Sequence, residues 1–277
     1  MSLRSNKSRF LPRIDVLEDR MVLATSITAG ATTTITGDGG VNKVKIVDNG
    51  DGDLKITDLV SGSVTTVNNV TKIKFDLKGG GDRISYTQTG NRTRSMTIDG
   101  KMGSGSDLFS GFIQGDILAN RTLDIKVLGD SGADGIDLTA NTDVDVQAGA
   151  TMKLRLSGGD DKDRVDFNYQ GELDGTMRYH LSGDGGDDNG AGFIRATIRA
   201  DLGSSGQVGL VGETALVEGN SGDDSLGHFV FKDPSDIFLA VSAKVDGGNG
   251  FLFFSGNDVA NHTANVTSVN VESDFIT

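Results

Sequence analysis

The feature of this sequence that most constrains its fold is a short glycine- and aspartate-rich word that recurs along the chain. Its pattern is apolar, any, Gly, Gly/Asp/Asn, any, Gly, any, Asp, any, apolar, as in "VLGDSGADGI" and "VEGNSGDDSL". The eighth position of each copy, called the anchor here, falls at Asn42, Asp82, Asp107, Asp134, Asp163, Asp188, Asp224 and Leu252. Most successive anchors are 25–29 residues apart. A period of this length is typical of a solenoid, in which each repeat buries its apolar face against its neighbours.

Several words follow directly on a segment in which apolar and polar residues alternate, for example "LDIKV", "MKLRL" and "MRYHL". Alternation predicts half-buried strands, and no helical periodicity follows residue 24. We therefore predict an all-β fold, a right-handed parallel β-helix or β-solenoid with Gly/Asp-rich turns over residues 25–277. Residues 43–57 read as a β-hairpin that caps its N-terminal end. An antiparallel β-sandwich is the alternative, although it does not require the same word at the same place in every repeat.

Charge and composition exclude several function classes. The net charge is −13, which argues against nucleic acid and anionic membranes as partners and leaves cations and basic surfaces. The chain has no cysteine, so disulfides, thiol catalysis and thiolate metal sites are excluded. No stretch of apolar residues is long enough to predict a transmembrane helix.

Residues 1–24 form a separate segment in this reading. Their first twenty residues hold five basic and three acidic side chains. Leu11, Ile14, Leu17 and Met21 recur at the spacing of a short amphipathic helix. A frayed terminal helix and a targeting segment are both open readings. The stretch "VLEDRMVLA" resembles the N-terminal Leu-Glu-Pro-Arg-x-Leu-Leu motif of many large planctomycete proteins, with Asp19 in place of the proline. That resemblance implies an extracellular or cell-envelope setting.

Stacking explains why like charges are concentrated in the turns. Equivalent residues of adjacent coils in a solenoid lie about 4.8 Å apart, so we expect Asp134, Asp163, Asp188 and Asp224 to form a column of carboxylates along one edge. Ca²⁺ binds six to eight oxygens from carboxylates, carbonyls and water, and a stack of Gly/Asp turns offers these ligands. The candidate calcium ligands are Asp82, Asp107, Asp130, Asp134, Asp160, Asp163, Asp184, Asp188 and Asp224. The alternative is that Asp, Asn and Gly are used only because they favour turns, without any metal.

The words also resemble the Gly-Gly-x-Gly-x-Asp nonapeptide of the RTX (hemolysin-type) proteins, whose β-roll turns bind calcium. By this resemblance Asp134, Asp163, Asp188 and Asp224 match the ligand aspartate. RTX arrays repeat every nine residues, whereas this chain has one word per coil. The resemblance implies a glycine-rich surface protein whose partners are calcium ions and extracellular matrix or surface polysaccharide.

A catalytic role is the least favoured reading. Parallel β-helices include polysaccharide lyases and hydrolases, and Lys126, Arg155, His180 and Lys244 occupy equivalent positions before the turn. With Asp166 and Arg178 they would line a groove. The chain offers few aromatic residues and few long loops to enclose a substrate, and the basic row also serves to balance the acidic turns. We therefore predict a non-catalytic, calcium-binding surface solenoid, with a metal-free structural or adhesive solenoid as the alternative.

Overall fold

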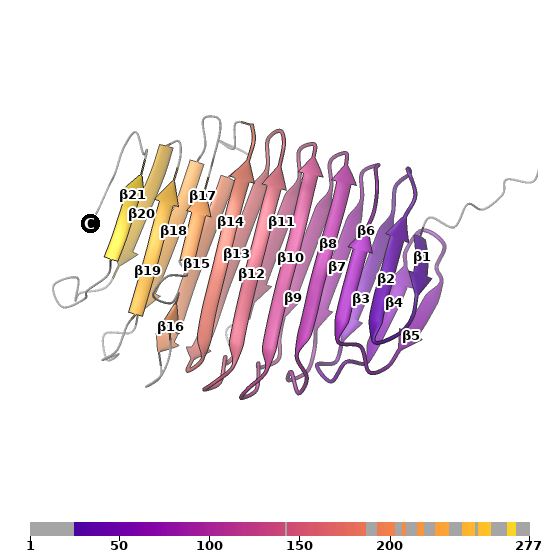
Figure 1. Cartoon of the computed structure of the whole chain (residues 1–277), viewed down its shortest axis with the longest axis horizontal. Coiled ribbons are helices and arrows are strands. Elements are labelled where there is room, and N and C mark those ends of the chain that lie inside the picture. Colours follow the sequence, from indigo (N-terminus) through magenta and orange to yellow (C-terminus); the bar gives the residue numbers. More distant parts are fainter. Residues whose placement is uncertain are drawn as a thin grey trace, which may run out of the picture.

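The computed structural model describes residues 25–141, 143–186, 193–202, 207–208, 215–218, 225–232, 240–246, 249–255 and 265–269. These residues form two long β-sheets, and the coils from β6 to β15 alternate between them, with one strand in each sheet (Figure 1). Within the described residues there is no helix, and so no helix that crosses a membrane. The predicted helix in residues 1–24 lies outside the described residues.

The first sheet, sheet A, has eleven strands. They are β1 (Thr25–Thr28), β2 (Thr32–Gly37), β6 (Lys72–Asp76), β8 (Met96–Ser104), β10 (Thr122–Ser131), β12 (Thr151–Gly159), β14 (Thr176–Asp184), β16 (Gln207–Val208), β17 (Ala215–Glu218), β19 (Ala240–Asp246) and β21 (Asn265–Val269).

The second sheet, sheet B, has ten strands. They are β3 (Lys43–Asp48), β4 (Leu54–Asp58), β5 (Val64–Val67), β7 (Arg83–Gln88), β9 (Leu108–Ile113), β11 (Gly135–Ala140), β13 (Arg164–Leu173), β15 (Phe193–Leu202), β18 (Ser225–Lys232) and β20 (Asn249–Ser255).

Pairing between coils is parallel, as a β-solenoid requires, and the antiparallel sandwich is therefore wrong. Among the described strands, antiparallel pairs occur only at the N-terminal end, where β1 pairs with β2 and β3, β4 and β5 form a meander. The hairpin predicted in residues 43–57 is thus confirmed, and it lies at the end of sheet B (Figure 1). Hairpins at this position cover strand edges that would otherwise pair with other chains.

The core lies between the two sheets, and the predicted alternation places the apolar residues there. Ile125 pairs in register with Ile98 and Leu154, and all three side chains are buried. Aromatic rings join the sheets: Phe75 of sheet A stacks on Phe109 of sheet B with ring centroids 6.1 Å apart. These inward columns fix the register, because a shift of one residue would turn every apolar side chain outward.

The last copy of the word departs from the predicted repeat, because Leu252 does not occupy an anchor position. Glu218 pairs with Asp246 before the turn, and His228 pairs with Leu252 after it. Residues 219–224 connect β17 to β18, whereas only residues 247–248 connect β19 to β20. Leu252 therefore lies within β20 rather than at an anchor.

Candidate cation-binding column of anchor aspartates

The anchor residues Asn42, Asp82, Asp107, Asp134 and Asp163 form a continuous ladder through the turns that lead from sheet A to sheet B. The Oδ1 atom of each aspartate accepts the backbone N–H of the anchor in the preceding coil. The N···O distances are 2.6 Å from Asn42 to Asp82, 2.6 Å from Asp82 to Asp107, 2.8 Å from Asp107 to Asp134 and 2.8 Å from Asp134 to Asp163. The predicted column of stacked carboxylates therefore exists in this part of the chain, and its side chains point into the protein.

Burial separates these carboxylates from solvent. The exposed fraction is 2% for Asp82, 4% for Asp107, 5% for Asp134 and 0% for Asp163. The Oδ2 atoms of Asp82, Asp107 and Asp134 are buried without a hydrogen-bond partner among the described residues. A buried carboxylate oxygen without a partner is costly, because its hydration is lost and not replaced.

This burial raises the pKa values of the anchor carboxyls. Loss of hydration raises the pKa of Asp107 to about 6 and that of Asp134 to about 7, despite the N–H bonds, which lower them. The neighbouring anchor carboxylate raises both values further. Burial raises the pKa of Asp82 as well. Near neutral pH the column therefore favours either protons or cations.

The other predicted ligands of the described turns lie on the outside. Asp130, Asp160 and Asp184 are exposed. Asp130 and Asp184 have positive φ angles of 75° and 67°, and stacked on them at the same turn position are Gly103 and Gly159, at 104° and 113°. Asp, Asn and Gly adopt this left-handed conformation most readily, so the fourth letter of the word serves the backbone. The remaining predicted ligands, Asp188 and Asp224, lie outside the described residues.

The first glycine of the word makes room for the anchor. A side chain at Gly129 would collide with Oδ2 of Asp134 and with the carbonyl oxygen of Gly158 in the next coil. A side chain at Gly158 would collide with Oδ2 of Asp163 in the same way. Carboxylate and carbonyl oxygens of successive coils thus converge on a surface without side chains, and these are the ligands that Ca²⁺ prefers.

The fit to calcium is therefore partial. The orphan Oδ2 atoms and the adjacent carbonyl oxygens suit a hard cation. However, no three His, Cys, Asp or Glu side chains of the described residues come together in a cluster that could hold a metal. A bound Ca²⁺ would need backbone carbonyls and water to complete its coordination.

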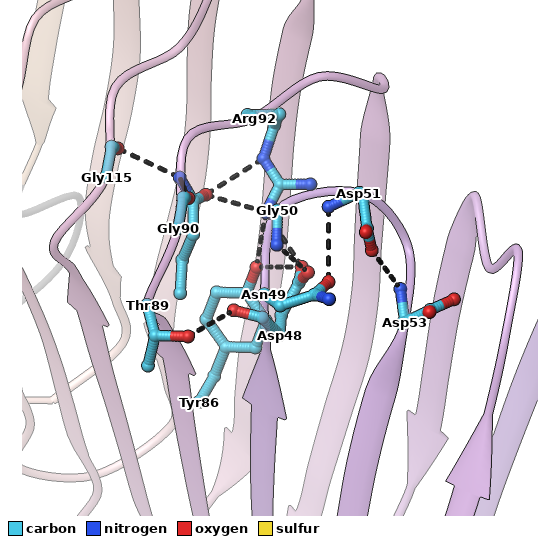
Figure 2. A network of polar contacts seen from close by, with 11 residues as sticks. Asp48, Asn49, Gly50, Asp51, Asp53, Tyr86, Thr89, Gly90, Arg92 and Gly115 are labelled. Atoms are coloured by element: carbon cyan, nitrogen blue, oxygen red, sulfur yellow. Dashed lines mark hydrogen bonds and ion pairs between the residues drawn. The ribbon is translucent and has the colours of Figure 1, made fainter.

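A second buried carboxylate, Asp48 at the end of β3, was not found from the sequence (Figure 2). Its Oδ2 atom accepts hydrogen bonds of 2.7 Å from the guanidinium of Arg92 and 2.7 Å from the hydroxyl of Tyr86, and its Oδ1 accepts the N–H of Gly50 at 2.8 Å. Arg92 also donates to Oε1 of Gln88. Asp48 and Arg92 are both 0% exposed. Nothing in "TGNRTRS" distinguishes Arg92 from its exposed neighbours, so only the fold reveals this network.

The basic row predicted before the turn does lie on one face. Lys126 pairs in register with Arg155, and Arg155 with His180, on the outer face of sheet A. In the register of the sheet, Leu216 is the partner of His180 and Lys244 is the partner of Leu216. The predicted groove with Asp166 is wrong, because Asp166 lies in β13 of sheet B, where it forms an ion pair with Arg195.

Comparisons with protein-family models, curated proteins and solved structures found no match to this chain.

Proposed function

We propose that this chain is a non-catalytic β-solenoid of the cell surface or the extracellular space, and that its anchor column binds Ca²⁺. The observation that carries the calcium proposal is the row of buried Oδ2 atoms at Asp82, Asp107 and Asp134, which have no hydrogen-bond partner in the part of the chain that the structure describes. Stacked carboxylates repel one another by about 1 kcal/mol per pair in water and more in a protein interior. A cation beside the row would remove that repulsion and satisfy the oxygens.

A metal-free structural or adhesive solenoid is the second candidate, and Asn42 favours it. Asn42 occupies the first anchor position without a charge, and its Nδ2 donates to the carbonyl oxygen of Gly40 at 2.8 Å. The anchor position therefore works as a turn residue without a cation. In this reading Asp134, whose pKa burial raises to about 7, is partly protonated at pH 7.

The non-catalytic part of the proposal is supported by the separation of candidate groups. The basic row Lys126, Arg155 and His180 lies on sheet A, and Asp166 lies on sheet B, so this acid and these bases do not face a common groove. The extracellular setting is supported by the N-terminal resemblance and by the fact that calcium sites of extracellular modules work at about 0.1–1 mM Ca²⁺.

Calorimetric titration of the EDTA-treated full chain with CaCl₂ at pH 7.5 tests the proposal, with MgCl₂ as the comparison. We expect saturable heat with Ca²⁺ and a weaker response to Mg²⁺, which demands near-ideal octahedral geometry. Asp134→Asn should reduce the calcium signal, and the matched control Asp130→Asn, in the same turn but exposed, should keep it. The absence of saturable heat in the parent would favour the metal-free candidate.

A further inference from the structure

We infer that the outer face of sheet A is a docking surface for an acidic polysaccharide, bound first in a groove at the N-terminal ends of its strands. This inference deepens the binding role proposed above and does not depend on calcium. The surface comprises the outward residues of β2, β6, β8, β10, β12 and β14 and the residues that precede β8 and β10.

Charge segregation is the first observation. The outward cations of these strands are Lys72, Lys74, Lys101, Lys126, Lys153, Arg155 and Arg178, and the outward acids are Asp76, Asp99, Asp124, Asp130 and Asp184. With His180 neutral, this face is net positive on a chain whose net charge is −13. A face of opposite sign to the whole molecule attracts polyanions locally while the remaining surface repels them.

The register of the sheet brings cations together at two places between β10 and β14, although it also sets Asp99 between Lys74 and Lys126, and Asp124 beside Lys153. Lys126 pairs with Arg155 on the adjacent strand, and Lys153 pairs with Arg178. Thr122 donates its N–H to the Ser95 hydroxyl, and the register of β8 and β10 places Arg94 and Arg121 at equivalent positions of adjacent coils. Stacked cations repel one another, so an extended anion that runs across the coils relieves several unfavourable pairs together.

A groove provides the starting point. It has a volume of about 690 Å³, and its walls include Lys72, Arg94, Arg121, Thr71, Ser95 and Thr97. Arg94 and Arg121 are exposed, and neither makes a side-chain hydrogen bond or ion pair with the described residues. Guanidinium groups pair with carboxylates or sulfates through two hydrogen bonds, and hydroxyls suit the hydroxyl groups of sugars.

The residue types on this face favour a polysaccharide over nucleic acid or a lipid surface. The outward positions of these strands include no Phe, Tyr or Trp on which nucleic-acid bases could stack, and Leu128 is their one large apolar residue. Insertion into a lipid surface requires an apolar face in addition to basic residues. A flat row of cations beside hydroxyl groups therefore fits a polysaccharide that carries carboxylates or sulfates.

Binding of polygalacturonate to the full chain, in EDTA at 50 mM NaCl and measured by affinity gel electrophoresis, tests this inference. EDTA keeps the result independent of the proposed calcium site and prevents calcium from gelling the polymer. We expect retardation by polygalacturonate, none by neutral dextran, and loss of retardation at 500 mM NaCl. The double variant Arg94→Gln/Arg121→Gln should bind about fivefold to tenfold more weakly, as expected for two exposed charge contacts.

The matched control removes two exposed lysines from sheet B of the first coil, Lys43→Gln/Lys45→Gln, and should change the affinity less than twofold. Circular dichroism of each variant verifies the fold. An equal loss in the control would mean nonspecific attraction and would overturn the inference. The inference would also be overturned if the parent is not retarded, or if it binds phosphatidylglycerol vesicles or single-stranded DNA more tightly than polygalacturonate. A third contrary result would be a dimer in sedimentation velocity that the double variant Arg94→Gln/Arg121→Gln dissociates, since a second copy would then occupy this face.

Discussion

The molecule buries aspartates in two ways. One carboxylate is paired with a cation of the protein itself, whereas the others favour a proton or a cation from solution. The carboxylate of Asp48 receives a guanidinium, a phenol hydroxyl and a backbone N–H. The carboxylate of Asp134 receives one backbone N–H and lies beside the carboxylate of Asp107. Asp48 is neutralised within the protein, whereas the anchor column is not. Burial of a charge alone therefore does not indicate a ligand site, and an unsatisfied oxygen is the better criterion.

The largest expected effect is the loss of the internal countercharge. Arg92→Met leaves Asp48 buried without its cation, which typically destabilises a protein by about 3–5 kcal/mol. The free energy of unfolding, measured in urea, should fall by that amount. The double variant Asp48→Asn/Arg92→Met removes both charges and should recover part of the loss. If Arg92→Met has the same free energy of unfolding as the parent, the ion pair of Asp48 and Arg92 does not stabilise the fold.

The pH dependence of stability should come next in size. The folded-state pKa values of Asp107 and Asp134, about 6 and about 7, are above their unfolded value of 3.8. Between those values the folded protein binds more protons than the unfolded chain, so the unfolding free energy falls as the pH rises. One pH unit of difference is worth about 1.4 kcal/mol per group, so between pH 5.5 and pH 8 the two groups together lose roughly 3 kcal/mol of unfolding free energy. In EDTA the melting temperature should therefore decrease from pH 5.5 to pH 8.

Calcium should flatten this pH dependence if it occupies the column. A cation that binds only the folded state stabilises it by about 2.7 kcal/mol at one hundred times its dissociation constant, and it competes with protons. Melting curves at pH 5.5 and pH 8, each with EDTA and with excess CaCl₂, measure this. A calcium shift at pH 8 that is absent at pH 5.5 would support the site. Equal melting curves with and without calcium would instead favour the metal-free solenoid, in which protons replace the cation.

Much of this organisation could be predicted from the sequence, for a physical reason. The stacked repeats need the same turn in each coil, so the word, its spacing and the strands before it all follow from one local geometry. The inward direction of the anchors could not be predicted, because an aspartate directly before a strand is the same sequence pattern whether its carboxylate points inward or binds a ligand on the outside. The first glycine of the word was the one sequence signal of the inward direction, because Gly129 and Gly158 each face an anchor carboxylate. The need for a left-handed backbone explains only the residues at the fourth and sixth positions of the word. Arg92 and Asp48 could not be predicted, because their pairing depends on how the hairpin cap lies against the next coil.

The substitution Asp134→Asn, which removes one charge from the anchor column, tests whether that column lacks a countercharge. In Asp134→Asn the Oδ1 atom can still accept the N–H of Asp107, and Nδ2 replaces the orphan oxygen beside the carbonyl of Gly158. Asn42 shows that an amide is accepted at an anchor, with Nδ2 3.5 Å from the equivalent carbonyl oxygen of Leu77. We expect this variant to be more stable than the parent in EDTA at pH 7.5 by roughly 1–2 kcal/mol, since it removes a buried charge and a repulsion. Urea unfolding in EDTA and in calcium measures it, and a destabilised variant in EDTA would mean that the parent carboxylate is already satisfied.

The smallest effect is expected at the outer turn, and it tests whether the inner or the outer aspartates are the ligands of the proposed calcium ion. Asp130 is exposed at φ 75°, and Asp130→Asn keeps a residue that tolerates this conformation while it removes one negative charge. Surface substitutions of this kind change the unfolding free energy by less than about 0.5 kcal/mol. The calcium shift of the melting temperature should therefore be the same in Asp130→Asn as in the parent, and smaller in Asp134→Asn. If Asp130→Asn instead loses the calcium shift and Asp134→Asn retains it, the ion binds the outer carboxylates, and the inward column is a ladder of turn residues.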